Sequence, residues 1–317
     1  NIVYSDATKG WIPLDDDVSA FEPTQPPTQK AIFGFGDDGS VSSLTNLVSS
    51  SGVVASDVTG VGTARRELAA SSYGGDKAIF GYGNTGSIVS MTNLVNNSGV
   101  VAADVTGVGT ARSGLAAASY GGDKAIFGYG TAGGQVSLTN LVNSSGVVAA
   151  DVTGVGTARN LLAAASYGTD KAIFGYGEAT GDTHQSLTNL VSNLGVVSAD
   201  VTGVGTIRVM LAAASYGTDK AIFAYGYGSG ADANVSMSNL VSNTGVVAAD
   251  VTGVGTARRQ LGAAGYGGDK AIFGYGIVSS VSSLTNLVSS SGVIAADVTG
   301  VGTARRAPAA SGFSYSA

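Results

Sequence analysis

Six copies of one short motif constrain the fold of this chain more than any other feature. The second copy reads Lys77-Ala-Ile-Phe-Gly-Tyr-Gly83, and the successive motif lysines are 47, 47, 47, 49 and 50 residues apart. The copies begin at Lys30, Lys77, Lys124, Lys171, Lys220 and Lys270. A short apolar run repeated at this period is typical of a protein built from copies of one supersecondary unit.

The composition favours an all-β protein. Apolar residues make up 44% of the chain, which is enough for a packed core, while charged residues make up only 12%, about half of the usual share. Glycine accounts for 49 of 317 residues, about twice its usual share. Much Gly, Ser, Thr and Val with few charges indicates short strands joined by tight turns. No segment has a sustained 3.6-residue apolar period, so we expect almost no helix.

Each repeat divides into four candidate strands. In the second copy these cover residues 68–73, 77–80, 90–95 and 100–106. Four short antiparallel strands every 40 to 50 residues are typical of a propeller blade. We therefore predict a six-bladed β-propeller of four-stranded antiparallel blades over residues 30–317, preceded by an N-terminal arm or linker over residues 1–29.

The two ends of the repeat region complement each other. Residues 305–313 align without gaps to residues 65–73, so the chain ends on a first strand that no second strand follows. The repeats begin at Lys30 with a second strand that no first strand precedes. A C-terminal strand that completes the first blade would close the circle and remove both exposed sheet edges.

Two motifs within the repeat resemble the kelch family of β-propellers. An arginine lies shortly before the first strand, as in Thr110-Ala-Arg112 with Leu115, and the second strand ends in two glycines, as in Ala78-Ile-Phe-Gly-Tyr-Gly83. The downstream tryptophan of that family is absent from all six copies. The resemblance covers residues 30–313 and implies a propeller of kelch-like blades.

The opening segment carries a second resemblance. Residues 1–13, which read Asn-Ile-Val-Tyr-Ser-Asp-Ala-Thr-Lys-Gly-Trp-Ile-Pro, are similar to segments of virion structural proteins of tailed phages. In such proteins these segments join upstream domains to a C-terminal module. The resemblance implies that the arm attaches the chain to a virion or surface assembly, such as a phage tail, fibre or capsid, and that the protein lies on a virion or extracellular surface.

Variation between the copies is confined to two segments. The distance from the motif lysine to the Leu or Met of the third strand is 14, 14, 14, 16, 17 and 14 residues, whereas the next 21 residues, up to the repeated arginine, never change in length. A second variable segment is the pair that follows this arginine. In a four-stranded up-and-down blade both segments lie on one face, so we predict a recognition face carried by loops on a uniform frame. Drift of exposed loops is the alternative.

The candidate ligand-binding residues are those of the two variable segments. In the loop between the second and third strands they are Asp37, Asp38, Asn84, Thr85, Glu178, Asp182, His184, Tyr227, Asp232 and Asn234. After the repeated arginine they are Arg66, Glu67, Asn160, Met210, Arg259 and Gln260.

One pair of charges repeats with the blade, an aspartate eight residues before an arginine. The six pairs are Asp57 and Arg65, Asp104 and Arg112, Asp151 and Arg159, Asp200 and Arg208, Asp250 and Arg258, and Asp297 and Arg305. We predict that these charges are structural, in a turn, a strand-end hydrogen bond or a pair between blades. The alternative is a ring of Arg or Lys at the channel mouth that binds an anion.

Several partners are disfavoured by the sequence. The net charge of −6 argues against nucleic acid, whose phosphates require clustered Lys and Arg. The chain has no cysteine, so it forms neither disulfides nor thiolate metal sites. No apolar run approaches the roughly 20 residues that span a bilayer. We expect no cofactor and no metal: Asp15, Asp16 and Asp17 are interpreted as a solvated loop, with calcium binding as the alternative, and the proline cluster at residues 23–27 as a linker.

Catalysis has little support in the sequence. His184 is the only histidine, and no strained nucleophile turn of the G-x-S-x-G kind accompanies it. The carboxylate pairs Glu178 with Asp182 and Asp37 with Asp38 each occur once. We therefore predict a non-enzymatic module that binds a host receptor or glycan. The alternatives are a purely structural or decoration propeller and a glycan-acting propeller enzyme.

Overall fold

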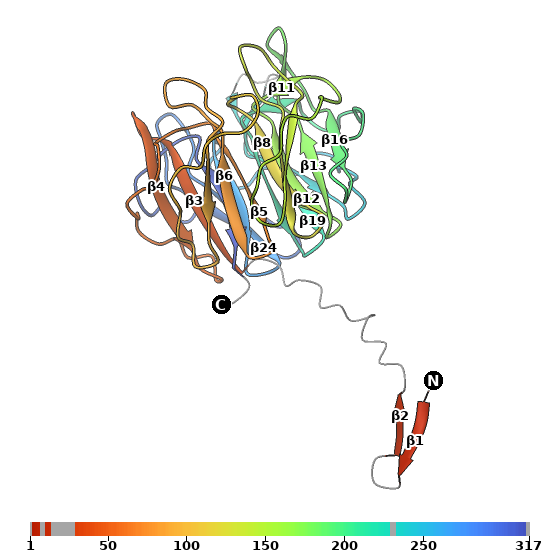
Figure 1. Cartoon of the computed structure of the whole chain (residues 1–317). Helices are drawn as coiled ribbons and strands as arrows, with labels where there is room; N and C mark the ends of the chain where they lie inside the picture. The colour runs from red at the N-terminus through yellow and green to blue at the C-terminus, as the bar shows by residue number, and fades with distance from the viewer. Residues whose placement is uncertain (1, 7–9, 14–28, 229–232, 315–317) are drawn as a thin grey trace.

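The computed structural model describes residues 2–6, 10–13, 29–228 and 233–314, and this part of the chain is all-β (Figure 1). It contains no helix, and therefore none that could cross a membrane. Near the start, β1 (Ile2–Asp6) and β2 (Gly10–Pro13) pair as an antiparallel hairpin. The aspartates at residues 15–17, the proline cluster at residues 23–27 and Asp232 lie outside the described residues.

The repeats form six three-stranded antiparallel sheets, which we number one to six by their middle strands. Each middle strand begins at the motif lysine. In the order first, middle and third strand, the sheets are β26 (Ala309–Phe313), β3 (Lys30–Asp37) and β4 (Val41–Val48); β5 (Ala69–Tyr73), β6 (Lys77–Gly81) and β7 (Thr92–Val95); β8 (Ala116–Tyr120), β9 (Lys124–Gly128) and β10 (Thr139–Val142); β12 (Ala163–Tyr167), β13 (Lys171–Gly175) and β16 (Thr188–Val191); β18 (Ala212–Tyr216), β19 (Lys220–Ala224) and β22 (Ser238–Val241); and β23 (Gly262–Tyr266), β24 (Lys270–Gly274) and β25 (Thr285–Val288).

Sheet one joins the two ends of the repeat region, as the alignment of residues 305–313 with residues 65–73 predicts. β26 pairs with β3 in a register that places Ala309 opposite Gly34 and Phe313 opposite Lys30. The first strands of the six sheets contact one another in the order β26, β5, β8, β12, β18, β23 and back to β26.

The core lies between neighbouring sheets, and the motif residues build it. Phe80 of sheet two packs edge-on against Phe35 of sheet one, with ring centroids 5.1 Å apart. Gly34 makes this approach possible, because a Cβ atom there would lie 2.7 Å from the Phe80 ring. The same aromatic pair joins every sheet to the next: Tyr82–Phe127, Tyr129–Phe174, Tyr176–Phe223, Tyr225–Phe273 and Tyr275–Phe33.

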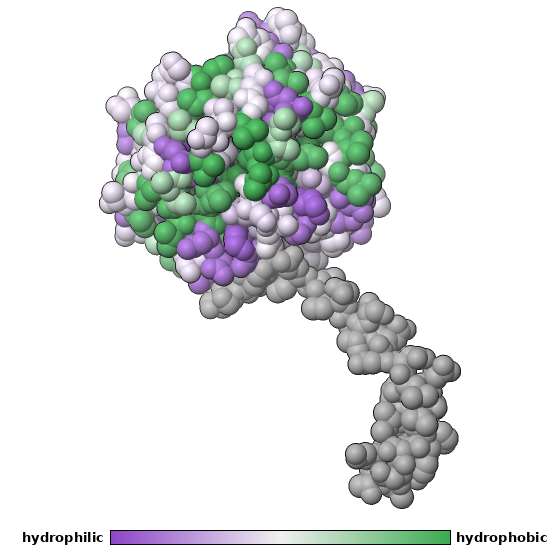
Figure 2. All heavy atoms as spheres, in the orientation of Figure 1, coloured by the Kyte–Doolittle hydropathy of each residue, from purple (hydrophilic) through white to green (hydrophobic). Residues whose placement is uncertain are grey.

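The prediction of a continuous fourth strand is wrong. In the second repeat this segment forms only two isolated bridges, Val95 with Val101 and Thr92 with Val105. Three residue steps separate the partners on one side and four on the other, so the ladder is interrupted by a bulge. The Asn93 side chain fills the gap by donating to the carbonyl oxygen of Ala102 at 3.0 Å. Val100 at the start of this segment is 60% exposed, and apolar residues are spread over the visible face of the molecule (Figure 2).

Candidate functional site

The variable pair after the repeated arginine divides between two places. In the second repeat the first residue of the pair, Arg66, bridges to Asn84 in the loop that precedes the third strand. This contact and its equivalents bring the two variable segments side by side in every repeat. The second residue, Glu67, turns away from the loop and faces the residues at the same position of the other repeats.

These second residues form a ring of six backbone hydrogen bonds. Each N–H donates to the carbonyl oxygen of the preceding repeat at 2.8–3.3 Å, in the order Gly114 to Glu67, Leu161 to Gly114, Met210 to Leu161, Gln260 to Met210, Ala307 to Gln260 and Glu67 to Ala307. All six have φ between 48 and 61°. A left-handed conformation disfavours residues that carry a Cβ atom. The repeated hydrogen bonds offset this cost and fix the direction of five variable side chains.

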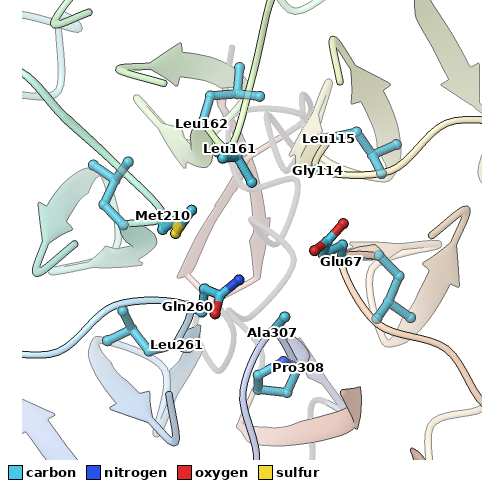
Figure 3. A pocket seen from close by; sticks show the side chains of 12 residues that line it. Glu67, Gly114, Leu115, Leu161, Leu162, Met210, Gln260, Leu261, Ala307 and Pro308 are labelled. Atoms are coloured by element: carbon cyan, nitrogen blue, oxygen red, sulfur yellow. The ribbon is translucent and has the colours of Figure 1, made fainter. Parts of the chain in front are cut away.

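The ring surrounds an axial cavity of about 100 Å³ (Figure 3). Its mouth is formed by the ring residues Glu67, Gly114, Leu161, Met210, Gln260 and Ala307. The residues that follow them also line it: Leu68, Leu115, Leu162, Leu211, Leu261 and Pro308. This second set is therefore nearly uniform and apolar, while the mouth differs from repeat to repeat.

The first residues of the pairs belong to six rows that run across the variable loops. In each row a residue after the repeated arginine lies opposite one loop residue, which lies opposite a second. In sheets four and five the rows are part of small three-stranded sheets, β11 (Arg159–Asn160) with β14 (Glu178–Ala179) and β15 (Thr183–His184), and β17 (Arg208–Val209) with β20 (Tyr227–Gly228) and β21 (Ala233–Asn234); β11 is at the upper end of Figure 1. The rows are Arg306–Asp37–Val41, Arg66–Asn84–Ile88, Ser113–Thr131–Gln135, Asn160–Glu178–His184, Val209–Tyr227–Asn234 and Arg259–Ile277–Val281.

The rows of sheets four to six are connected through their side chains. Nε2 of His184 lies 3.7 Å from Oε2 of Glu178, and the His184 ring meets the Tyr227 ring edge-on at 6.4 Å. The Arg259 guanidinium lies 5.0 Å from the centroid of Tyr227 and donates to Oδ1 of Asn234 at 3.3 Å. These contacts form a continuous polar and aromatic strip. At its start, Nδ1 of His184 and Oδ1 of Asn160 are buried without a hydrogen-bond partner in the described residues.

A second side-chain cluster joins the rows of sheets one and two. The buried Asp37 carboxylate accepts hydrogen bonds from Arg66 and, at 3.4 Å, from Arg306. Burial opposes ionisation of Asp37, but the N–H of Gly39 and the two arginines outweigh it, so the pKa of this carboxyl lies below its usual value. Both guanidinium groups stay more than a third exposed. Asp38 is exposed next to Asp37, and Asp182 is exposed in the β14–β15 hairpin.

The repeated charges, predicted to lie in a turn, a strand-end hydrogen bond or a pair between blades, connect neighbouring sheets, and each arginine lies near the aspartate of the next repeat instead of the one eight residues before it. Arg65 is fully buried and donates to the Tyr82 carbonyl at 2.8 Å and to Oδ1 of Asn93 at 2.6 Å, both in the next sheet. Its Nη1 lies 3.8 Å from Asp104, and its guanidinium lies 4.4 Å from the centroid of Phe35. Burial lowers the pKa of Arg65 to about 10, and the Asp104 charge opposes this shift. Each of the six arginines donates to the corresponding asparagine of the next sheet, whereas Nε of Arg112 and of Arg208 has no hydrogen-bond partner in the described residues.

The alternative of an anion-binding ring of Arg or Lys at the channel mouth is wrong. All six repeated arginines are fully buried, and each donates to an asparagine of the neighbouring sheet. Five of the repeated lysines form ion pairs with the aspartate just before them, as Lys77 does with Asp76 at 2.7 Å. No arginine or lysine lines the axial cavity.

The turns on the opposite side differ little from one another. The turn between the first and middle strands reads Gly-Gly-Asp or Gly-Thr-Asp in five repeats. These turns make a second ring of backbone hydrogen bonds at 2.7–3.0 Å, in which Gly74 donates to Asp123, Gly121 to Asp170, Gly168 to Asp219, Gly217 to Asp269, Gly267 to Gln29 and Ser314 to Asp76. The uniform sequence is explained by this requirement, because every turn has to match the next.

Catalytic chemistry gains no additional groups from the fold. Glu178 and His184 lie opposite each other in β14 and β15, but within residues 29–228 and 233–314 no three His, Cys, Asp or Glu side chains are grouped as a metal site. No serine donates to His184 among the hydrogen bonds of these residues. The arrangement can present donors, acceptors and one aromatic ring to a ligand.

Sequence comparison between the repeats missed part of this surface. Thr131 and Gln135 complete the row of Ser113, and Ile277 and Val281 complete the row of Arg259. The residues of these two rows can be located by counting along the sequence from the glycine that follows the motif tyrosine. The bridges keep the same register in these repeats, so this count would have identified Thr131, Gln135, Ile277 and Val281. No protein-family model and no curated protein matches this chain. The structure therefore defines the class only, an all-β tandem-repeat protein whose variation lies at the axial mouth and along six rows.

Proposed function

We propose that the six sheets form a closed, kelch-like six-bladed β-propeller that acts as a non-enzymatic recognition module. Three observations support closure: β26 completes sheet one, the first strands contact one another in a circle, and each end of the sheets has a ring of six hydrogen bonds. The pairing of β26 with β3 covers one edge of each of these two strands, which would otherwise invite pairing with another chain.

The observation that carries the recognition function is the contrast between the two ends of the sheets. The variable end differs between repeats in loop length and in the chemistry of its rows, and it includes charged, aromatic and amide side chains. The opposite turns are equally part of the surface but are nearly uniform. Both ends carry a ring of backbone hydrogen bonds, yet only one end differs from repeat to repeat, so the contrast favours selection for a ligand at the variable end.

The frame suits this role because it fixes the loops before a ligand arrives. The rows are held by backbone pairs, and the arginine contacts anchor each repeat to the next. A preorganised surface loses little conformational entropy on binding. The ligand we propose is a receptor or glycan on a host surface, and the N-terminal arm attaches the module to a virion or other surface assembly.

A binding screen tests this proposal. Fluorescently labelled protein would be applied to a glycan array and to intact host cells. A loop variant in which residues 178–184 are replaced by the five residues 131–135 removes the Glu178–His184 pair and keeps a loop length found in the chain. We expect it to bind at least tenfold more weakly than the original protein. Thr169→Gly is the matched control, since it gives the opposite turn the sequence of sheet three.

Four outcomes would argue against recognition by the variable face. Equal binding by the loop variant and the original protein would show that the strip of sheets four to six does not contact the ligand. Equal losses in the loop variant and in Thr169→Gly would indicate a general loss of folding. Absence of binding to every glycan and cell surface would favour a decoration protein. Chemical change of a bound glycan after long incubation would favour the glycan-acting enzyme instead.

A further inference from the structure

We propose that the axial cavity binds a lysine side chain presented by the protein partner, with the lysine ammonium held by Glu67 and Gln260. This inference rests on the proposed recognition function and specifies the chemistry of its central contact. Figure 3 shows both side chains at the cavity mouth, on different sides of the axis.

The backbone ring decides which charge the mouth accepts. Each of the six ring N–H groups already donates to a neighbouring carbonyl oxygen, so none is available to hold an anion. Polar recognition is therefore left to the side chains of the mouth. Of these, only Glu67 and Gln260 are polar.

The Glu67 carboxylate has no partner of its own. No hydrogen bond or ion pair engages this side chain within the described ranges, and the neighbouring Arg66 is turned to Asp37 instead. A carboxylate left in this position beside an apolar cavity attracts a cation, because the low polarity around it strengthens the attraction.

The number of acceptors matches an ammonium group. The two carboxylate oxygens of Glu67 and the amide oxygen of Gln260 offer three acceptors, and an ammonium group has three N–H donors. A guanidinium is planar and pairs its fork with one carboxylate, so its other donors do not converge with that carboxylate on an oxygen across the axis such as that of Gln260. A calcium ion would require about six to eight oxygen ligands.

The apolar part of the cavity matches the lysine stem. Leu161, Met210 and Ala307 line the mouth, and five leucines and a proline also line the cavity. Lysine methylenes gain free energy when they are buried against such a surface. The cavity of about 100 Å³ is several times the roughly 10–15 Å³ that one water molecule requires, so it accepts part of a side chain but not a folded segment.

Methionine methyl NMR can test this site directly. The chain contains three methionines, and only Met210 lines the cavity, so Met91 and Met237 are internal references. The probe is an end-capped pentapeptide with a central lysine, titrated into the full chain labelled with ¹³C at the methionine methyl groups. We expect a saturable shift of the Met210 signal alone. Glu67→Gln should raise the apparent Kd at least tenfold. Unchanged Met91 and Met237 signals would show that the variant is folded.

Three comparison peptides decide between chemistries. Peptides with central acetyl-lysine, norleucine or arginine should shift Met210 at least tenfold less effectively at equal concentration. Equal binding of acetyl-lysine or norleucine would show a purely apolar pocket, and equal binding of arginine would refute ammonium selection; either overturns the proposal. A silent Met210 signal also overturns it, and if host-surface binding persists in that case, the recognition function itself stands. A shift of the Met210 signal without any binding to host surfaces would support the lysine site but contradict the wider recognition function.

Discussion

Nε of Arg305 donates a hydrogen bond of 2.8 Å to the carbonyl oxygen of Phe35, which lies 270 residues earlier in the chain. The same guanidinium donates to Oδ1 of Asn46 at 2.7 Å and lies 4.2 Å from the centroid of the Tyr275 ring. One buried side chain thus contacts sheets six and one. The other five arginines also donate to the equivalent asparagine of the next sheet, and Arg65, Arg159 and Arg258 repeat the bond to the carbonyl oxygen, so the two ends of the repeat region are joined by the same contacts as neighbouring sheets.

Arg305→Met should destabilise the protein by about 3 kcal/mol, because it leaves buried acceptors in sheet one without donors. Urea unfolding followed by tyrosine fluorescence measures the change. Arg306→Met is the matched control: its guanidinium is more than a third exposed, and we expect a loss below about 1 kcal/mol. Equal losses for the two variants would contradict the role assigned to Arg305.

Asp57→Asn should make the free energy of unfolding less sensitive to low pH. Burial raises the pKa of Asp57, but hydrogen bonds from Thr303 and Asn46 and the charge of Arg305 outweigh it and bring the pKa below its usual value. The carboxylate therefore stabilises the fold above the unfolded pKa of about 3.9, and this contribution is lost as the pH falls through the lower folded pKa. The free energy of unfolding between pH 5 and pH 2.5 should fall more steeply for the original protein than for the variant.

Tyr82→Phe should flatten the alkaline limb of the stability curve. Burial raises the pKa of Tyr82 to about 12, against the opposing charge of Arg112, while the unfolded pKa is about 10. The fold favours the neutral phenol, so its stability should decrease as the pH rises from 10 to 12. At pH 8 the variant should lose about 1 kcal/mol, since it lacks the hydrogen bond to the Val108 carbonyl. Urea unfolding at pH 8, 10 and 11 measures both effects; an alkaline limb as steep as that of the original protein would refute the assignment. Phe35 occupies the equivalent position in sheet one, so the ring itself is tolerated.

Gly81→Ala should destabilise the protein by about 2 kcal/mol, because its Cβ atom would lie 2.7 Å from the Phe127 ring. Sheet five provides the reverse test. Ala224 stands at the equivalent position there, and the adjacent Tyr225 and Phe273 rings are 5.4 Å apart instead of 5.1–5.2 Å. Ala224→Gly should change stability by less than about 1 kcal/mol in thermal unfolding. A larger cost for Ala224→Gly than for Gly81→Ala would show that this close approach does not select glycine.

The arrangement of the repeats could be predicted because the repeats can be aligned with one another in the sequence. The alignment of residues 305–313 with residues 65–73 predicts the pairing of β26 with β3, and the six-fold recurrence of aspartate and arginine predicts a structural role, although Arg305 lies near Asp57 and not near the aspartate eight residues before it. Both follow from the chain being compared with itself. The fourth strand misled the prediction, since its valines suggest a strand whereas the side chain of Asn93, in the preceding strand β7, interrupts the ladder.

The division of the variable pair could not be predicted. Arg66 and Glu67 are adjacent and both variable, yet one joins a row and the other the axial ring. The left-handed φ of 55° at Glu67 directs its side chain away from that of Arg66. Only the neighbouring repeats impose this conformation. A positive φ cannot be predicted at a glutamate, leucine, methionine or glutamine, because these residues rarely adopt one.

Blocking each end of the sheets in turn tests the central claim most directly. The chain has no cysteine, so Ser87→Cys in a variable loop and Ser98→Cys in an opposite turn, both exposed positions, can each be coupled to a bulky maleimide polymer without other labelling. Binding to the surface found in the screen is then compared before and after coupling. We predict that the polymer at position 87 abolishes binding and that the polymer at position 98 changes it less than twofold. Loss of binding on coupling at position 98, with binding retained on coupling at position 87, would contradict recognition by the variable face.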